Sequence, residues 1–350
     1  MDADADAQRD AQRGRVAAAF AARHRWRRAE TAFWLLAFVA WAALPRQAPI
    51  GNEIAILALF ALSLDLILGY AGIVSLGHAA FFGAGAYAAG LFAKHVSGDP
   101  LLGLAVATSV ATLLGFATSF LVLRGSDLTR LMVTLGVALV LGEVANKAAA
   151  FTGGADGLQG VVIAPLFGRF AFDLSGRAAF AYSLAVLFAL FVVARRIVNS
   201  PFGASLRAIR DNPLRAAAVG IPVRRRLVAI YTIAAAYAGA AGALLAQTTQ
   251  FVSLDALAFD RSADVLLMLV IGGAGWLYGG LAGALVFKVA QDVFSGLTPQ
   301  YWHFWLGLVL VVLVLTGRER LHERIARLVR GRRGAVPVPP GGDAVRADRV

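Results

Sequence analysis

The chain has 350 residues, of which 59% are apolar and only 15% are charged, yet its formal net charge is +12. An average soluble domain has about 25% charged residues. A basic chain of this kind is either a nucleic-acid binder or a multi-pass membrane protein with cationic loops. Apolar runs of about 20 residues match the bilayer core and exclude a soluble nucleic-acid binder. Cysteine is absent, which excludes disulfides, thiolate metal sites and a cysteine nucleophile.

The first 30 residues are polar and end in a cationic cluster at 23–28. An apolar run at 31–44 follows. A positive flank before a short apolar core is also typical of a secretory signal peptide. We favour a retained first membrane helix, because the polar segment before it is too long for a simple signal-peptide n-region and further apolar runs follow at once.

The remaining apolar runs occupy residues 53–68, 73–92, 101–123, 131–151, 178–193, 227–246, 263–290 and 304–316. Most have the length of a membrane-spanning helix. The run at 263–290 contains Gly272, Gly273 and Gly275, which we expect to split it into two limbs. The pattern therefore predicts an all-α polytopic membrane protein with about nine to ten transmembrane or broken helices.

The distribution of charge predicts the orientation of these spans. The segment 195–226 has eight arginines against one aspartate, and the segment after residue 318 is also strongly basic. By contrast, 152–177 has no net charge and 250–264 has three aspartates against one arginine. Cytoplasmic loops are enriched in Lys and Arg, so we expect the basic loops and both termini to be cytoplasmic. A cytoplasmic C-terminus then needs an odd number of crossings after residue 250. Two limbs of the run 263–290 together with 304–316 would supply it, and the short limbs also suit tilted or discontinuous segments, so one crossing or two by 263–290 stays open.

A weak internal repeat accompanies the broken segments. Gly69, Gly72 and Gly77 are followed 203 residues later by Gly272, Gly275 and Gly280, and both groups follow a Leu/Ile-rich run. Transporters built from two inverted repeats have discontinuous helices at corresponding positions. Chance is the alternative, because the chain contains 37 glycines.

These patterns divide the chain into a polar, basic segment at 1–30, a membrane domain at 31–317 that includes the basic loop 195–226, and a tail at 318–350. Within the tail, Leu321, Ile325 and Leu328 fall on one helical face, with charged residues on the others. This indicates an amphipathic helix on the inner leaflet. The Gly- and Pro-rich end is typical of disorder.

Motifs of catalysis are missing. The sequence has no Walker A loop, no His-Glu-x-x-His pair and no Gly-x-Ser-x-Gly elbow. We therefore expect a transport subunit rather than an enzyme, with no metal or cofactor of its own. Any ATP would have to be bound and hydrolysed by a separate subunit.

Ionisable residues within apolar runs cost about 2.5–3.5 kcal/mol each at a helix centre, so each needs a partner or a function. Asp65 stands late in the run 53–68. Glu143 precedes Lys147 by four residues, the favourable order for a helical ion pair, and Lys288 precedes Asp292 in a similar pair.

The densest cluster of small and polar residues lies at 69–87 and includes Tyr70, Ser75, Gly77 and His78. Small residues allow close approach of helices, so the purely structural interpretation of this cluster is a helix-packing face. The functional interpretation is a bend that exposes backbone groups to a translocation path.

The loop 195–226 is longer than a simple positive-inside loop requires. Pro201 and Pro213, with Asp211 and Asn212 between them, predict two short helices separated by a turn. Leu206 and Ile209 provide one apolar face. This pattern favours a docking surface.

Five motifs in order resemble those of the LivM-like branched-chain amino acid ABC transporter permeases, over most of residues 50–317. They are Gly69-Tyr70-Ala71-Gly72 with Ser75-Leu76-Gly77-His78-Ala79-Ala80-Phe81-Phe82-Gly83, Thr152-Gly153-Gly154-Ala155-Asp156-Gly157-Leu158, Gly203 with Arg207-Ala208-Ile209-Arg210-Asp211-Asn212, Gly220-Ile221, and Gly272-Gly273-Ala274-Gly275.

The resemblance implies a role for each motif. Gly203, Arg207, Arg210, Asp211, Asn212 and Gly220 would form a coupling segment that docks on an ATP-binding subunit. Thr152, Gly153, Gly154 and Asp156 would face a periplasmic substrate-binding protein. Asp65, Tyr70, Ser75, Gly77, His78, Gly272 and Gly275 would line or flex the path. A second, homologous permease subunit, the lipid bilayer and a location in the bacterial inner membrane are also implied.

Two departures from the family pattern stand out. Asp65 occupies a position where the family usually has Asn, and its partner is not evident from the sequence. Thr134-Leu135 and Glu143 are further apart than in the usual Thr-Leu…Glu pattern, which weakens any carried-over role for Glu143.

The sequence thus favours the permease subunit of an ABC importer for branched-chain or other small hydrophobic amino acids. The alternative from a different class is an ion- or proton-coupled secondary transporter in which Asp65, His78 and Glu143 are the coupling groups. A membrane enzyme is disfavoured, because no catalytic constellation is present.

Overall fold

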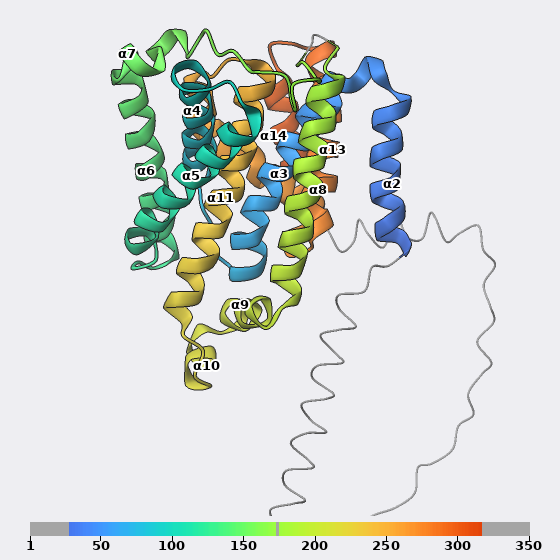
Figure 1. The fold of residues 1–350 in the computed structure, drawn as a ribbon. Coiled ribbons are helices and arrows are strands. Elements are labelled where there is room, and N and C mark those ends of the chain that lie inside the picture. Colours follow the sequence, from blue (N-terminus) through green and yellow to red (C-terminus); the bar gives the residue numbers. More distant parts are fainter. Residues whose placement is uncertain (1–27, 173–174, 317–350) are drawn as a thin grey trace, which may run out of the picture.

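The computed structural model describes residues 28–172 and 175–316, and these residues are helical apart from turns, loops and two isolated bridges (Figure 1). The first half contains α2 (Arg28–Ala43), α3 (Ala48–Ala71), α4 (Ala79–His95), α5 (Pro100–Val122), α6 (Asp127–Lys147) and the short α7 (Ala149–Thr152). The second half contains α8 (Arg177–Asn199), α9 (Pro201–Asp211), α10 (Pro213–Ala218), α11 (Val223–Thr249), α12 (Phe259–Gly272), α13 (Leu277–Leu297) and α14 (Trp302–Thr316).

Six helices among the described residues are long and apolar enough to cross a membrane, judged by length and composition. They are Pro45–Ala71, Pro100–Val122, Asp127–Lys147, Arg177–Asn199, Val223–Thr249 and Leu277–Leu297. Beside them lie four shorter helices, α2, α4, α12 and α14, of 16, 17, 14 and 15 residues. The expected all-α membrane fold is confirmed in this form, with six candidate spans.

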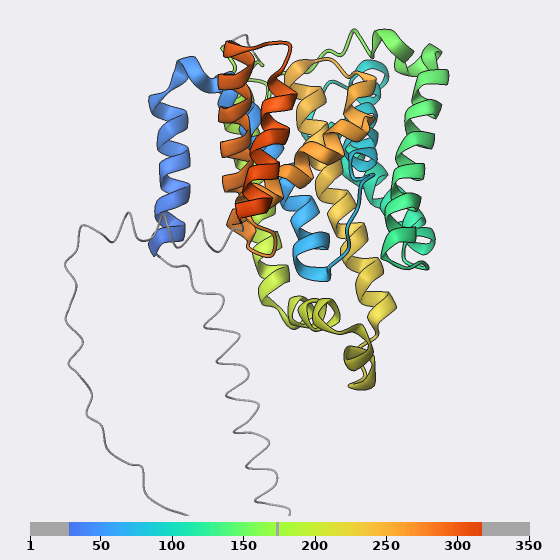
Figure 2. The same ribbon diagram turned by 180° about the vertical axis from the view of Figure 1, so that it is seen from behind.

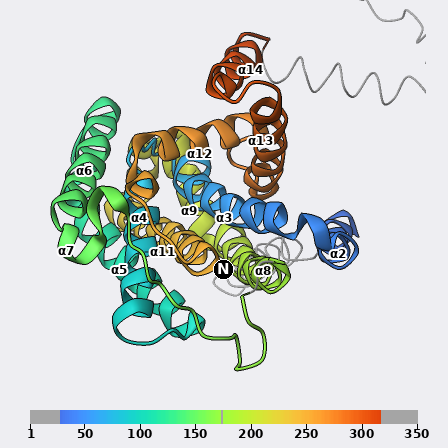
Figure 3. The same cartoon turned by 90° about the horizontal axis from the view of Figure 1, so that it is seen from above.

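Helix α3 is the centre of the bundle. Seen from above, it runs between α8 and α11 on one side and α12 and α13 on the other (Figure 3), and it packs against all four. Its sequence is apolar around its whole circumference, which is the pattern of a helix enclosed by others. Phe60, Leu62 and Leu64 are fully buried, whereas α5 and α6 expose most of their side chains.

Helices α4 and α11 approach unusually closely, because small residues line their contact. A Cβ on Gly85 would collide with the Gly239 backbone, and a Cβ on Gly242 would collide with the Phe82 carbonyl. The part of α11 from Ala234 to Ala246 is rich in buried alanine. Helices in membranes associate through van der Waals packing of such small residues.

The chain is interrupted at two places within the bundle. The first interruption is longer than expected, since α3 ends at Ala71 and α4 begins only at Ala79. The prediction of one run over 73–92 is therefore wrong at its start. Gly72 takes a left-handed conformation that ends α3, and residues 73–78 are non-helical although apolar residues continue there.

The second interruption lies where the glycines predicted it. Helix α12 ends at Gly272, α13 begins at Leu277, and Gly273 and Gly275 have positive φ angles. The expected division of the 263–290 run is confirmed. The second limb is longer than expected, because α13 continues to Leu297 and is itself a candidate span. Figure 2 shows α12, α13 and α14 as neighbours at the back of the bundle.

Helices α9 and α10 project from one end of the bundle, which we call the α9 end (Figure 1). They confirm the two short helices predicted from Pro201 and Pro213. The Arg28 end of α2 and the last turn of α14 lie toward the same end, while α7 lies at the opposite end (Figure 1). The predicted amphipathic helix at 318–330, the disordered tail and most of the N-terminal segment lie outside the described residues.

Candidate functional site

Asp65, on the last two turns of α3, is fully buried and contacts the second interruption. The backbone N–H of Gly275 donates a hydrogen bond of 2.7 Å to its Oδ1 atom. Gly69 lies one turn further along α3, and a Cβ there would collide with both the Asp65 carboxylate and the Gly275 backbone. Glycine at position 69 therefore allows the α12–α13 interruption to rest directly on α3.

Arg210 of α9 completes this contact. Its Nη1 atom donates to the Gly69 carbonyl oxygen, close to the end of α3. The last carbonyl groups of a helix have no partner within the helix, and a cation near them interacts favourably with the helix dipole. We call the set of Asp65, Gly69, Arg210 and Gly275 the α9 junction, because it joins α9, α3 and the α12–α13 interruption.

A second arginine of α9 strengthens the same attachment. The Arg207 guanidinium lies 6.0 Å from the centroid of the Tyr70 ring, at the end of α3. It also donates a hydrogen bond of 3.2 Å to the Val198 carbonyl of α8. Arg207 and Arg210 are three residues apart, so they share one face of α9.

The sequence around α9 explains its short length and position. The Ser200 side chain caps its N-terminus at Gly203, Pro201 occupies the first helical position, and Leu206 and Ile209 are buried. A Cβ on Gly203 would collide with the Val198 backbone, so α9 packs closely on the end of α8.

After α9 the chain turns at once into α10. Asn212 caps α10 by accepting a hydrogen bond of 2.9 Å from the Arg215 backbone N–H. Asp211 lies 3.4 Å from Arg210 and is largely exposed. Gly220 follows α10 with a φ angle of 86°, and a Cβ at this position would meet no atom within 4 Å, so it is a turn residue open to its surroundings.

The first interruption holds a separate buried cluster. The Nε2 atom of His78 lies 2.8 Å from the Ser63 hydroxyl, and its ring stacks on Phe60 with centroids 5.6 Å apart. The Ala79 backbone N–H donates to the Ser262 hydroxyl of α12 at 2.9 Å. His78 and Ser75 are both fully enclosed, so this interruption is held by side chains from other helices.

Helix α6 also contacts this first interruption. A Cβ on Gly77 would collide with the Thr134 carbonyl, and the Thr134 hydroxyl accepts a hydrogen bond of 3.3 Å from the Leu76 backbone N–H. The expected path residues thus fall into two groups. Asp65, Tyr70 and Gly275 meet at or beside the α9 junction, and Ser75, Gly77 and His78 lie together in the first interruption. Gly272 lies elsewhere, packed against the Gly279 carbonyl.

The predicted outer loop lies at the end opposite α9. The Thr152 hydroxyl donates to the Ala145 carbonyl at 2.6 Å, and Gly153 and Gly154 both have positive φ angles. Asp156 is exposed. The Leu158 backbone N–H donates to the Val252 carbonyl at 2.7 Å, which ties this loop to the segment that follows α11.

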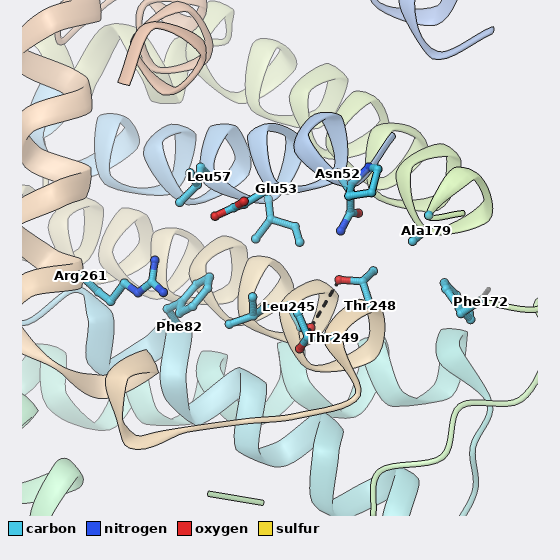
Figure 4. A pocket seen from close by; sticks show the side chains of 13 residues that line it. Asn52, Glu53, Leu57, Phe82, Phe172, Ala179, Leu245, Thr248, Thr249 and Arg261 are labelled. Carbon is cyan, nitrogen blue, oxygen red and sulfur yellow. Dashed lines mark hydrogen bonds between the residues drawn. The ribbon is translucent and has the colours of Figure 1, made fainter. Parts of the chain in front are cut away.

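A cavity of about 520 Å³ opens near this same end, between α3 and α11 (Figure 4). Its polar lining includes Asn52, Glu53, Thr248 and Arg261. None of the path candidates predicted from the sequence is among its lining residues. Sequence reasoning missed this cavity, although Glu53 at the start of an apolar run and Arg261 within an acidic segment were available signals.

The ion pairs predicted from helical spacing are confirmed. Lys147 lies 3.4 Å from Glu143, with both side chains more than half exposed. Lys288 lies 3.1 Å from Asp292 and, in addition, 2.7 Å from Glu53 of α3. The latter contact joins α13 to α3 at the edge of the cavity and was not predicted.

A helical bundle with six candidate spans, two interrupted segments and a short helical pair projecting from one end defines a multi-pass membrane protein. Residues 48–315 match the family model described as the permease component of the branched-chain amino acid transport system. The chain belongs to this family.

Curated relatives agree with the family match. The chain is 28% identical over 276 residues to the high-affinity branched-chain amino acid transport system permease protein LivM of Escherichia coli, covering 73% of this chain and 64% of that protein. It is 30% identical over 282 residues to LivM of Salmonella typhimurium, with the same two coverages. A probable LivM of Methanocaldococcus jannaschii is 26% identical over 309 residues, covering 73% and 86%. The chain thus spans 64% of the length of the two bacterial relatives. No solved structure gave a significant match.

Proposed function

We propose that this chain is the transmembrane permease subunit of an ABC importer for branched-chain or other small hydrophobic amino acids. The family match supports the transport role. The proposed coupling mechanism is based on the α9 junction, where Arg210 of the projecting helix α9 donates a hydrogen bond to the end of the central helix α3. A projecting helix attached to the core in this way can transmit a conformational change from a docked subunit to the bundle.

In this proposal, ATP is bound and hydrolysed by separate ABC ATPase subunits that dock on α9 and α10. Leu206 and Ile209 face the bundle, while Asp211, Asn212 and Arg215 remain exposed for contact. Movement of α9 would pass through Arg210 to Gly69 and from there to Gly275, because these residues touch. The α12–α13 interruption would then switch the path between outward and inward access.

The orientation follows from charge. The α9 end contains the eight arginines of segment 195–226, and such loops remain in the cytoplasm. We therefore place the α9 end and both termini in the cytoplasm, with the multi-pass domain 31–317 in the bacterial inner membrane. The N-terminal segment 1–30 and the tail 318–350 would lie at the inner surface, where basic residues meet anionic lipid.

The opposite end would face the periplasm. Exposed Asp156 and the glycine turns beside it would contact a periplasmic substrate-binding protein. A second homologous permease subunit would complete the path.

Reconstitution tests this function. The chain is assembled in proteoliposomes with its ATPase subunits, its partner permease and its binding protein, and uptake of radiolabelled leucine is measured with and without ATP. We expect uptake only with ATP and with the binding protein present. Uptake that persists without ATP, or after removal of the ATPases, would contradict the proposal.

That negative outcome would point to the secondary transporter built on Asp65, His78 and Glu143. The geometry does not favour it. Asp65 bonds to Gly275, His78 bonds to Ser63, and Glu143 lies on the exposed face of α6 beside Lys147. These three groups have separate partners and do not form a relay among the described residues.

A further inference from the structure

The cavity between α3 and α11 combines charged groups of both signs with an apolar wall. Glu53 enters it from α3, and Arg261 enters it from the first turn of α12. Figure 4 shows Glu53 on the α3 side of the space and Arg261 beside Phe82 at one end of it. Its volume of about 520 Å³ lies within the usual range for small-molecule sites.

Glu53 is held in place by a neighbour from another helix. The Lys288 ammonium lies 2.7 Å from its Oε2 atom, and Lys288 is itself buried and also contacts Asp292. Lys288 therefore has an acidic partner on each side. The Glu53 side chain remains 43% exposed, so its carboxylate can accept further hydrogen bonds from a group in the cavity.

The remaining walls are suited to an aliphatic side chain. Ile56 and Leu57 of α3, Phe82 of α4 and Leu245 of α11 line the cavity. Figure 4 shows Leu57, Phe82 and Leu245 close to the end where Glu53 and Arg261 lie. An apolar lining with a few placed polar groups is the general pattern of a ligand site.

The cavity is connected to the loop that we propose as the contact for the binding protein. Thr248 and Thr249, at the end of α11, line the cavity, and Val252 lies three residues further on. Val252 and Leu158 exchange two backbone hydrogen bonds, of 2.7 and 3.3 Å. A protein docked on 152–158 would thus sit beside the mouth of the cavity.

We propose that this cavity is a subsite for a zwitterionic aliphatic amino acid on its way from the binding protein into the membrane domain. The Glu53 carboxylate accepts hydrogen bonds from the α-ammonium group, and the Arg261 guanidinium donates to the α-carboxylate, both as charge-assisted bonds. Leu57, Phe82 and Leu245 contact the aliphatic side chain. The inference rests on the proposed transport function and adds to it a place of recognition within this chain.

Cysteine protection tests the subsite without requiring transport. The native chain has no cysteine, so Thr248→Cys places a single thiol in the cavity wall. The full-length variant in liposomes is exposed to a small cationic methanethiosulfonate reagent, and its labelling rate is followed by the mass of the intact chain. We expect millimolar leucine to slow labelling at least threefold. Leucinamide lacks the carboxylate and 4-methyl-2-oxopentanoate lacks the ammonium, so neither should protect.

Two charge-neutralising variants complete the test. In the Thr248→Cys background, Glu53→Gln and Arg261→Gln should each abolish protection by leucine. Glu143→Gln and Arg124→Gln, at exposed positions that do not line the cavity, should leave it intact. Equal protection by leucine and both analogues, or none by leucine, would overturn the subsite.

The uptake assay separates this inference from the function on which it rests. In the reconstituted complex, Glu53→Gln or Arg261→Gln should lower leucine transported per ATP hydrolysed about tenfold, the usual effect of one lost bond to a charged group. Transport equal to that of the unmodified complex would count against the subsite. If the unmodified complex shows no ATP-dependent uptake, the proposed function fails, and the protection assay still decides the subsite.

Discussion

The Asp65 carboxylate of α3 accepts a 2.7 Å hydrogen bond from the backbone N–H of Gly275, a residue 210 positions later in the chain. This bond fixes the α12–α13 interruption against the central helix. Asp65 is fully buried and Gly275 is partly buried, so the bond is largely shielded from water. Asp65 is therefore best understood as a structural acceptor at the α9 junction.

The first prediction follows from that role. Asp65→Leu should destabilise the protein by about 1–3 kcal/mol, because the partly buried Gly275 N–H loses its acceptor. Asp65→Asn keeps an oxygen in the same place, so it should retain stability and most ATP-dependent uptake. The measurements are thermal unfolding of the purified complex in detergent and initial uptake rates in proteoliposomes.

A comparison of the two variants distinguishes a hydrogen-bond acceptor from a proton carrier. A carrier requires a group that titrates, and Asn does not. If Asp65→Asn abolished uptake as fully as Asp65→Leu, the structural role of Asp65 would be refuted and the proton-coupled alternative would gain support.

The second prediction concerns Arg210. Arg210→Glu places a carboxylate beside the Gly69 carbonyl oxygen, so two acceptors face each other where a donor now stands. A hydrogen bond to a charged group contributes about 1.5–3 kcal/mol, so its loss should release α9 from α3 and lower the amount of ATPase that copurifies with the complex about tenfold. The level of the chain in membranes should not change.

Asp211→Arg tests the exposed side of the same helix. Its side chain is 70% exposed and lies 3.4 Å from the Arg210 guanidinium, so reversal of its charge should weaken ATPase docking and also remove an ion-pair partner of Arg210. Arg124→Glu is the matched control, because it is an exposed arginine in another loop at the α9 end. Unchanged copurification with both Arg210→Glu and Asp211→Arg would show that the coupling segment lies elsewhere.

Much of this architecture could be predicted from local patterns. The two short helices α9 and α10 follow from proline and capping residues within a few positions, and the second interruption follows from adjacent glycines. Glu143 and Lys147 pair because helix geometry places residues four apart on one face. Each of these features depends on residues that are close in sequence.

Features that depend on distant residues could not be predicted. Nothing near Asp65 indicates that Gly275 is its partner, and the pairing of Glu53 with Lys288 crosses most of the chain. The cavity has the same origin, because its walls come from separate helices. The start of α4 was missed for a different reason: Ile73 and Val74 continue the apolar pattern although the backbone there is not helical.

The third prediction concerns α2 and the alternative of a cleaved signal peptide. Trp34 of α2 is only 4% exposed and packs on Phe188 and Phe191 of α8, with ring centroids 4.9 and 5.1 Å apart. Trp34→Ala should destabilise the protein by about 3–5 kcal/mol, the usual cost of removing a buried aromatic side chain. Thermal unfolding in detergent measures this effect.

Leu36→Ala is the matched control for Trp34, because Leu36 lies on the same helix and is 69% exposed. It should change stability by no more than about 0.5 kcal/mol. Mass spectrometry of the intact protein from membranes should also show that α2 is retained. A mature chain that begins after residue 44, or equal effects of the two substitutions, would contradict a packed first helix.

The fourth prediction links the packing of α4 and α11 to the cavity. A Cβ on Gly242 would collide with the Phe82 carbonyl, and the Phe82 side chain lines the cavity. Gly242→Leu must therefore push α4 away from α11, with a cost of about 3 kcal/mol or more. The displacement of α4 should also change the labelling rate of a cysteine at position 248, because Phe82 and Thr248 line the same cavity.

Gly136→Ala is the control for this substitution, because no atom lies within 4 Å of a Cβ at Gly136 in α6. Replacing an open helical glycine by alanine should stabilise the protein by about 0.5–1 kcal/mol. We therefore expect Gly242→Leu to lower the unfolding temperature and Gly136→Ala to raise it. Shifts of the same sign would mean that α4 and α11 are not in backbone contact, and Phe82 would then not be held at the cavity wall by this packing.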